Sequence, residues 1–203
     1  MSKRPFNKGK NSIKLPPGQR AVRRILRWGI DHPAIISEIP KLDLKKWKLH
    51  VDGEVEKSLH LSWEDLLKLT HVVSVSDFHC VEGWSVLDCR WGGVLFKTLI
   101  EEVKPRKEGK YVFFECADSY TTCLSLKDLL DNDVILAYEL NGEILEVSHG
   151  GPLRLVVPNK YGYKSAMWIT RIRFIKNEKL GFWEKRGYSN TADVWRNDRY
   201  AVQ

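Results

Sequence analysis

The segment 77–85, Asp-Phe-His-Cys-Val-Glu-Gly-Trp-Ser, holds the residue types of this chain that are best suited to chemistry. Within it, Cys80 lies between His79 and Glu82. A cysteine thiolate is a strongly donating ligand for a transition metal, and a thiol beside a histidine can also be a nucleophile. A nucleophile needs an oxyanion arrangement as well, and no cysteine-protease signature surrounds this cysteine. Cys80 is therefore a metal ligand, a nucleophile or a small buried hydrophobe, and residue types alone do not choose among the three.

Two later segments carry residue types that suit an anion. In His-Gly-Gly-Pro-Leu-Arg at 149–154 a histidine and an arginine flank a glycine turn, and 159–165 contains two lysines, a glycine and a serine. Glycines let the backbone approach a ligand closely, and an arginine fork matches a phosphate. Neither segment is a Walker loop or a dinucleotide fingerprint, and a glycine turn with solvated charges is the alternative for each. The presence of three such segments in one small chain weighs against turns without a function.

Strands and short helices must position these segments. Residues 47–61 alternate apolar and polar side chains around Asp52-Gly53, which is typical of a β-hairpin. Ser62 and Asp65 have the spacing of a capping box and predict the start of a helix. A strand predicted at 72–76 leads directly into the cysteine-containing segment.

The rest of the chain continues this mixture of strands and short helices. In order, the pattern predicts a loop at 91–93, a helix at 94–103, a strand at 111–117, a short helix at 124–130, a strand at 134–140 closed by an Asn141-Gly142 turn, and strands at 153–157 and 171–175. The elements do not show the regular alternation of a doubly wound fold. We therefore predict the α+β class with a mixed or mostly antiparallel sheet.

The positive charge of the chain is concentrated near its beginning. The chain has 33 Lys and Arg against 26 Asp and Glu, a net charge of +7, and nine of the basic residues precede Asp31, the first acidic one. The remainder carries a charge of about −2, which argues against a nucleic-acid-binding surface on the body. We divide the chain into a loosely attached basic N-terminal arm, residues 1–27, and one domain, residues 28–203.

Cysteine usage and hydropathy favour a cytoplasmic protein. Cys80, Cys89, Cys116 and Cys123 form no C-x-x-C pair, so neither a zinc site nor a disulfide framework is expected. No apolar run approaches the roughly 18 residues of a membrane helix. The Arg23-Arg24 pair is not followed by the apolar stretch of an export signal. We expect a cytoplasmic protein that is not inserted in a membrane.

Taken together, the motifs resemble a known family. The sequence Cys80-Val-Glu-Gly-Trp-Ser, the segment from His149 to Pro158, the segment from Lys160 to Ser165 and the segment from Gly181 to Tyr188 occur in the order found in the molybdopterin-binding domain of the sulfite oxidase family. The chain is most similar to the small sulfite-oxidase-like branch, which is related to the catalytic subunit of methionine-sulfoxide reductase. The resemblance covers roughly residues 28–200 and implies a sulfite-oxidase-type mixed-sheet fold.

The resemblance also implies a cofactor and a set of site residues. The cofactor is Mo-molybdopterin, in which a protein cysteine ligates the molybdenum, and Cys80 matches that ligand. The implied catalytic residues are Cys80, Glu82 and Tyr188, with the tyrosine as a proton donor to an oxo group. The implied cofactor-binding residues are His32, Cys80, Cys116, His149, Arg154, Lys164, Ser165, Ala166 and Met167.

One departure from the family pattern bears on the substrate. Sulfite oxidases follow their cysteine with an arginine-rich stretch, whereas Glu82 follows Cys80 here. A carboxylate repels a sulfite dianion by roughly 4 kcal/mol per pair of unit charges at 4 Å and an effective dielectric of 20. We therefore favour sulfoxide or N-oxide reduction over sulfite oxidation.

Partners and alternative functions complete the hypothesis. No haem-binding segment or ferredoxin-like cysteine run is present, so a separate electron-transfer protein is expected beside the small oxo-donor or oxo-acceptor substrate. The resemblance also implies a monomer, because the C-terminal dimerisation domain of sulfite oxidases has no room after Tyr200. A second hypothesis is a non-catalytic domain of the same fold that binds a partner through its basic arm. A third is nucleic-acid binding through that arm, which would show a steep dependence on salt.

Overall fold

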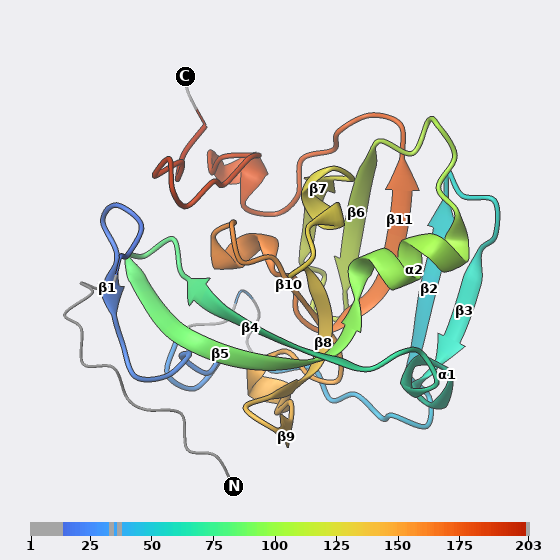
Figure 1. Cartoon of the computed structure of the whole chain (residues 1–203), viewed down its shortest axis with the longest axis horizontal. Coiled ribbons are helices and arrows are strands. Elements are labelled where there is room, and N and C mark those ends of the chain that lie inside the picture. Colours follow the sequence, from blue (N-terminus) through green and yellow to red (C-terminus); the bar gives the residue numbers. More distant parts are fainter. Residues whose placement is uncertain (1–13, 33–34, 36–37, 202–203) are drawn as a thin grey trace, which may run out of the picture.

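Two β-sheets form most of the protein. The computed structural model describes residues 14–32, 35 and 38–201. The six-stranded sheet has the order β1-β5-β8-β10, with β4 on β5 and β9 on β8. Its strands are β1 (Arg20–Ala21), β4 (Val72–His79), β5 (Trp84–Leu95), β8 (Ile135–Leu140), β9 (Glu143–Ile144) and β10 (Arg154–Val156). Figure 1 shows this sheet beside the second one.

The second sheet has five strands in the order β3-β2-β11-β6-β7. These are β2 (Lys48–Gly53), β3 (Leu59–Ser62), β6 (Tyr111–Cys116), β7 (Thr121–Ser125) and β11 (Ile169–Ile175). β2 pairs with β11 and β1 with β5 in parallel, and the other pairs are antiparallel. The sheets are mixed and the helices are few, which confirms the predicted α+β class.

The helices are short and locally determined. They are α1 (Trp63–Leu67), α2 (Phe96–Val103) and the 3₁₀ helices Asp128–Leu130, Val147–His149, Gly162–Lys164 and Glu184–Arg186. The predicted capping box is present at α1, because Asp65 N–H donates to Ser62 Oγ and Ser62 N–H donates to Asp65 Oδ2. The buried face of α2 packs Phe96, Leu99 and Val103 into the main core.

Three local predictions were wrong. The glycines at 92–93, expected in a loop, lie inside β5, where a Cβ at Gly93 would overlap the carbonyl oxygen of Leu136 on the neighbouring strand. The predicted short helix at 124–130 is instead the end of β7 followed by one 3₁₀ turn. Gly53 does not form a tight hairpin turn: it ends β2 in close approach to the backbone of Phe174, and the connection to β3 is longer.

The main core lies between the five-stranded sheet, α2 and the strands β8 and β10. It includes the inward side chains of β2, β6 and β11, such as Leu49, Phe114 and Ile172, which are fully buried. A second cluster lies on the six-stranded sheet around Phe78 and Trp91. These two clusters make the sheets a rigid support for the loops at their ends.

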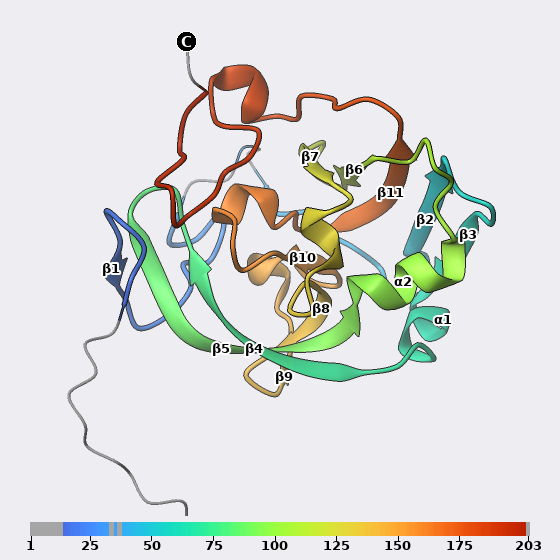
Figure 2. The same cartoon turned by 45° about the horizontal axis from the view of Figure 1, so that its top comes forward.

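The first and the last described segments, which begin at residue 14 and end at residue 201, lie together at one end of the molecule (Figure 2). Arg20 and Ala21 pair with Trp84 and Ser85 at the start of β5, and Ile25 is only 6% exposed. The described part of the expected arm, residues 14–27, is therefore packed on the domain, and residues 1–13 lie outside the described part. Figure 2 shows the first and last segments beside the same ends of β4 and β5. The division of the chain at residue 27 stays a prediction.

Candidate active site

A cleft opens where these terminal segments meet the sheet. Its empty space, including the open mouth, amounts to about 970 Å³. Most of the predicted site residues line it, namely His32, Cys80, Glu82, His149, Arg154, Ser165, Met167 and Tyr188. Apolar and aromatic side chains complete the lining, among them Ile25, Trp28, Phe78, Trp84 and Trp183.

Cys80 stands in the short connection between β4 and β5. Its backbone N–H donates to the carbonyl of Trp84, and its own carbonyl accepts from Gly83 N–H, so the connection is a tight turn. Cys80 is 8% exposed, and burial raises the pKa of its thiol to about 12. Without a bound metal the thiol is therefore protonated at neutral pH. A metal cation is the partner that would stabilise the thiolate form.

Glu82 places a negative charge beside this thiol. Its Oε2 lies 3.9 Å from Cys80 Sγ and accepts a hydrogen bond from Trp84 Nε1 at 3.3 Å. Its Oε1 lies 2.9 Å from His32 Nε2, and the His32 ring stacks on Trp28. Burial acts to raise the pKa of Glu82, but the hydrogen bonds from His32 and Trp84 outweigh it and the net shift is downward. Glu82 is thus a carboxylate at neutral pH.

Arg154, the first residue of β10, is a buried cation. Its side chain lies over the rings of Phe78 and Trp91 at 5.2 Å from each, and the residue is 2% exposed. Nη1 donates to the carbonyl of His149 at 2.7 Å, while Nε has no hydrogen-bond partner among the described residues. Burial lowers its pKa to about 10, which still leaves it charged at neutral pH.

An unpaired guanidinium at the wall of a cleft fits an anionic ligand. A buried cation without a counter-charge is costly, and an arginine fork binds a phosphate with two charge-assisted hydrogen bonds. None of the ion pairs within the described residues involves Arg154. Arg154 therefore offers the site that the phosphate of a pterin cofactor would need.

Glycines shape the loops around this site. Gly150 follows His149 with φ +102°, and a Cβ there would lie 2.7 Å from Met167 Cγ. A Cβ at Gly162 would lie 2.6 Å from the edge of the Phe78 ring. Burial lowers the pKa of His149, the residue before Gly150, so its ring is neutral at pH 7. Its Nε2 lies 3.3 Å from the carbonyl oxygen of Ile25. Close packing of the two loops at 149–154 and 159–165 thus depends on glycines, which have no side chain.

Ser165 and Ala166 directly follow the 3₁₀ helix Gly162–Lys164. Ser165 Oγ accepts a hydrogen bond from Val157 N–H, and the carbonyl of Ala166 accepts one from Leu155 N–H. Ser165 lines the cleft, whereas the side chain of Ala166 lies in the main core. Both residues therefore tie the loop to β10 and its continuation.

Lys164 is not among the residues that line the cleft. We expected it at the phosphate, but its Nζ donates to Glu184 Oε1 at 2.5 Å and to the carbonyl of Cys123 at 2.8 Å. Both side chains of the ion pair are 1% exposed. Desolvation favours this outcome, because a buried ammonium needs a carboxylate close by, and Glu184 comes from a part of the chain that local sequence does not connect to Lys164.

Cys116 ends β6 and also lies outside the cleft lining. It is 7% exposed and packs in the main core, and burial raises its pKa well above the usual value. The turn that follows it does reach the cleft, through Asp118 and Tyr120. Sequence reasoning missed these two residues, and the only local signal for them was a polar turn after a buried strand.

Tyr188 lines the cleft within an aromatic cluster. Its ring lies 5.5 Å from that of Tyr163, 5.2 Å from that of Trp183 and 5.4 Å from that of Tyr200. Burial raises the pKa of the Tyr188 hydroxyl. The phenol therefore keeps its proton at neutral pH and can serve as a donor.

A cleft that offers both a thiol and an unpaired guanidinium is suited to a cofactor that carries a metal and a phosphate. Residues 36–183 match the model of the family described as "Oxidoreductase molybdopterin binding domain", and the chain belongs to this family. It is accordingly a molybdopterin-dependent oxidoreductase of the sulfite oxidase family, and the residues present fit that cofactor: Cys80 for the metal and Arg154 for the phosphate.

Relatives narrow the branch of the family. The chain is 42% identical over 158 residues to "Uncharacterized oxidoreductase YuiH" of Bacillus subtilis, covering 78% of this chain and 80% of that protein. It is 33% identical to the "Protein-methionine-sulfoxide reductase catalytic subunit MsrP" of Campylobacter jejuni, covering 76% of this chain but 57% of that protein. It is 32% identical to the "Putative protein-methionine-sulfoxide reductase subunit YedZ1" of Azospira oryzae, covering 75% and 58%. The chain thus spans little more than half the length of these two reductase relatives.

A solved structure supports the fold. The sulfane dehydrogenase SoxCD of Paracoccus pantotrophus matches with a TM-score of 0.66 and 25% identity, over 74% of this chain and 43% of that one. The mixed-sheet fold predicted from the motifs is therefore confirmed. Proteins similar to this chain thus include a dehydrogenase as well as reductases.

Proposed function

We propose that this molybdopterin-dependent enzyme reduces a small neutral oxo-donor, a sulfoxide or an N-oxide. For a sulfoxide the balanced reaction is R₂SO + 2 e⁻ + 2 H⁺ → R₂S + H₂O. The cofactor, when bound, supplies the two-electron chemistry. The polypeptide has to hold it, exclude bulk water and deliver a proton.

The observation that carries the proposal is the charged Glu82 beside Cys80. The carboxylate lies 3.9 Å from the sulfur, and the hydrogen bonds that keep its pKa low hold it ionised. A sulfite dianion at the metal would be repelled by this charge, whereas a neutral sulfoxide would not. The Glu82 side chain is 51% exposed, so solvent screens part of the repulsion. The reductase names of the Campylobacter and Azospira relatives support the same direction.

The proposed residue roles follow from the geometry. Cys80 ligates the metal, and Arg154, oriented by the carbonyl of His149, binds the cofactor phosphate. The Tyr188 hydroxyl holds the proton that is passed to the departing oxygen. The aromatic lining excludes water and leaves an apolar surface for the organic groups of the substrate.

The electrons come, in this proposal, from a separate electron-transfer protein. Within the described residues, no group of three or more His, Cys, Asp or Glu could hold a second metal centre. No helix in the described part of the chain is long and apolar enough to cross a membrane. A monomer in the cytoplasm stays the prediction for its state and location.

Reoxidation of the reduced enzyme tests the proposal. The protein is reduced with dithionite in the presence of methyl viologen, and a series of sulfoxides and N-oxides is screened for reoxidation, with sulfite and ferricyanide as the opposing assay. We expect rapid reoxidation by at least one neutral oxo-donor and slow turnover of sulfite. Faster sulfite oxidation would reverse the proposed direction. Full cofactor occupancy without either activity would favour the non-catalytic binding domain.

A further inference from the structure

The N-terminal segment makes a specific contact with the backbone of the cysteine turn. Gln19 Nε2 donates a hydrogen bond to the carbonyl oxygen of Cys80 at 3.0 Å, across 61 residues of sequence. Gln19 Oε1 accepts a hydrogen bond from Ser85 Oγ at 2.9 Å, and Ser85 Oγ in turn lies 2.7 Å from His79 Nδ1. One side-chain amide thus contacts both ends of the turn that carries the thiol.

Backbone pairing fixes where this amide lies. Gln19 N–H closes a turn onto the carbonyl of Pro16, and Arg20 N–H then donates to the carbonyl of Gly83. Val22 N–H donates to the carbonyl of Ser85. The described segment 16–22 therefore lies along residues 83–85 in fixed register, and Gln19 is held opposite Cys80.

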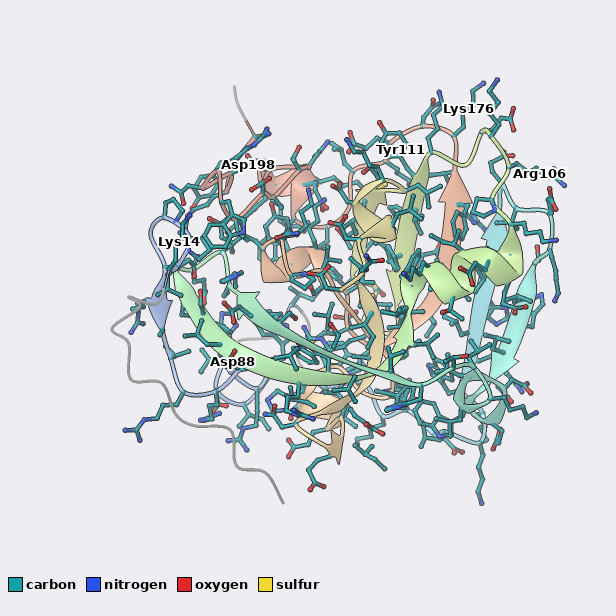
Figure 3. The ribbon with its side chains drawn as sticks, in the orientation of Figure 1. Lys14, Asp88, Arg106, Tyr111, Lys176 and Asp198 are labelled. Atoms are coloured by element: carbon teal, nitrogen blue, oxygen red, sulfur yellow. The ribbon has the colours of Figure 1, made fainter. Side chains whose placement is uncertain are left out.

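The C-terminal segment closes the same turn from the other side. Arg199 Nη1 donates to the carbonyl of Val81, and its Nη2 donates to the carbonyl of Gly18 at 3.1 Å. Gly18 has φ +68°, and a Cβ there would lie 2.9 Å from Arg199 Nη2. In Figure 3, Lys14 and Asp198 lie at this end of the molecule, while Arg106 lies at the other. The turn is thus held between the two terminal segments.

We propose that Gln19 is a positioning residue for the cysteine ligand: its amide fixes the Cys80 carbonyl and the Ser85 hydroxyl, and so sets the direction in which the thiolate meets the metal. Groups that orient a metal ligand without touching the metal commonly change affinity or activity by about 10–100-fold when they are removed. The basic segment before the domain then has a role in the site. This inference rests on Cys80 being the ligand, as the proposed function requires.

Three variants separate the contacts of Gln19. Gln19→Leu removes the hydrogen bonds to Cys80 and Ser85 at similar size, together with the side-chain hydrogen bond to Tyr161. Gln19→Glu keeps the acceptor for Ser85 but places a carboxylate oxygen against the Cys80 carbonyl. Ser85→Ala removes only the second partner. Arg20→Gln, at the exposed next residue, which begins β1, is the matched control. Gln19→Glu and Ser85→Ala keep the test open where Gln19→Leu fails to fold.

Two readouts on the cofactor-loaded enzyme decide the matter. The exchange rate of the Gly83 amide, which donates to the Cys80 carbonyl, should rise about fivefold in Gln19→Leu, the factor that corresponds to about 1 kcal/mol for one net hydrogen bond. The Mo(V) electron paramagnetic resonance signal should change its g values, and kcat should fall about tenfold or more while KM stays within about twofold. Arg20→Gln should match the parent in each measurement.

Unchanged exchange and an unchanged Mo(V) signal in both Gln19 variants would overturn the inference. Ser85→Ala should add little in the Gln19→Leu background, because the two side chains act as one unit; full additivity would also contradict the inference. A third outcome separates this inference from the proposed function. If neither the parent nor Gln19→Leu contained molybdenum, but the Gly83 amide exchanged faster in Gln19→Leu, the contact that fixes the turn would stand. The ligand role of Cys80 would then be overturned instead.

Discussion

Arg154 donates from Nη1 to the carbonyl of His149 at 2.7 Å and leaves its Nε without a partner among the described residues. The first contact fixes the plane of the guanidinium, and the second fact leaves a donor free in a buried place. The loop that carries His149 is therefore organised around a cation that has no anionic partner among the described residues. In the proposed function, the phosphate of the cofactor supplies the missing negative charge.

Replacing Arg154 should separate cofactor binding from folding. In Arg154→Met we expect cofactor occupancy to fall at least tenfold, since the charge-assisted hydrogen bonds to the phosphate are lost. The cofactor-free protein should lose no stability, because an unpaired buried charge is removed. Occupancy is measured by elemental and pterin analysis, and stability by thermal unfolding. Equal occupancy in parent and variant would show that the phosphate binds elsewhere.

Neutralising Glu82 should change substrate preference. In Glu82→Gln we expect the ratio of kcat/KM for sulfite to that for a neutral sulfoxide to rise at least about tenfold, since the repulsion of a dianion is removed. The exposed Glu64 on α1 provides the control variant Glu64→Gln, which should leave the ratio unchanged. A ratio that does not move in Glu82→Gln would remove the electrostatic reason for favouring sulfoxides.

Breaking the Lys164–Glu184 pair should destabilise the fold. In Lys164→Met we expect a loss of about 3–5 kcal/mol in the free energy of unfolding, because the buried carboxylate of Glu184 is left without its partner. The exposed pair of Lys57 and Glu102, 3.8 Å apart, is the control, and Lys57→Met should cost at most about 1 kcal/mol. Urea unfolding measures both. A stable Lys164→Met protein that has lost its cofactor would restore the phosphate role first expected for this lysine.

Asp118 should make stability depend on pH in the direction opposite to most carboxylates. Burial raises its pKa above the usual 3.8, although its Oδ1 accepts a hydrogen bond from Tyr120 N–H. The folded state therefore binds this proton more tightly than the unfolded state, and the contribution of Asp118 to stability falls as pH rises from about 4 through the raised pKa. Asp118→Asn should exceed the parent in stability at pH 7, at matched molybdenum occupancy, and the difference should shrink at pH 4. A constant difference at both pH values would exclude this linkage.

Local sequence predicted the elements whose signals are local. The capping box of α1 and most strands follow from side-chain alternation and hydrogen-bonding residues within a few positions. Gly92 and Gly93 misled the prediction because a glycine pair is typical of a loop, whereas here close contact with β8 requires it. Close strand pairing of this kind is visible only once the neighbouring strand is in place.

The candidate site likewise contains residues that local motifs predict and contacts that they do not predict. Cys80, Glu82 and Arg154 were predicted from motifs and line the cleft. The partner of Lys164 and the contact of Gln19 with Cys80 arise from residues 20 and 61 positions apart, which no local pattern connects. Contacts of this kind are decided by packing and desolvation, and they are the part of the site that sequence did not predict.

Molybdenum content tests the central claim most directly. The protein is purified from molybdenum-replete cells, and metal and pterin are measured per chain in the parent, in Cys80→Ser and in Cys89→Ser, the last as a matched control at a buried cysteine outside the cleft. The account predicts about one molybdenum and one pterin per chain in the parent and in Cys89→Ser. It also predicts that the Cys80→Ser protein lacks the Mo(V) signal. A metal-free parent protein, or a Cys80→Ser protein with the signal of the parent, would contradict it.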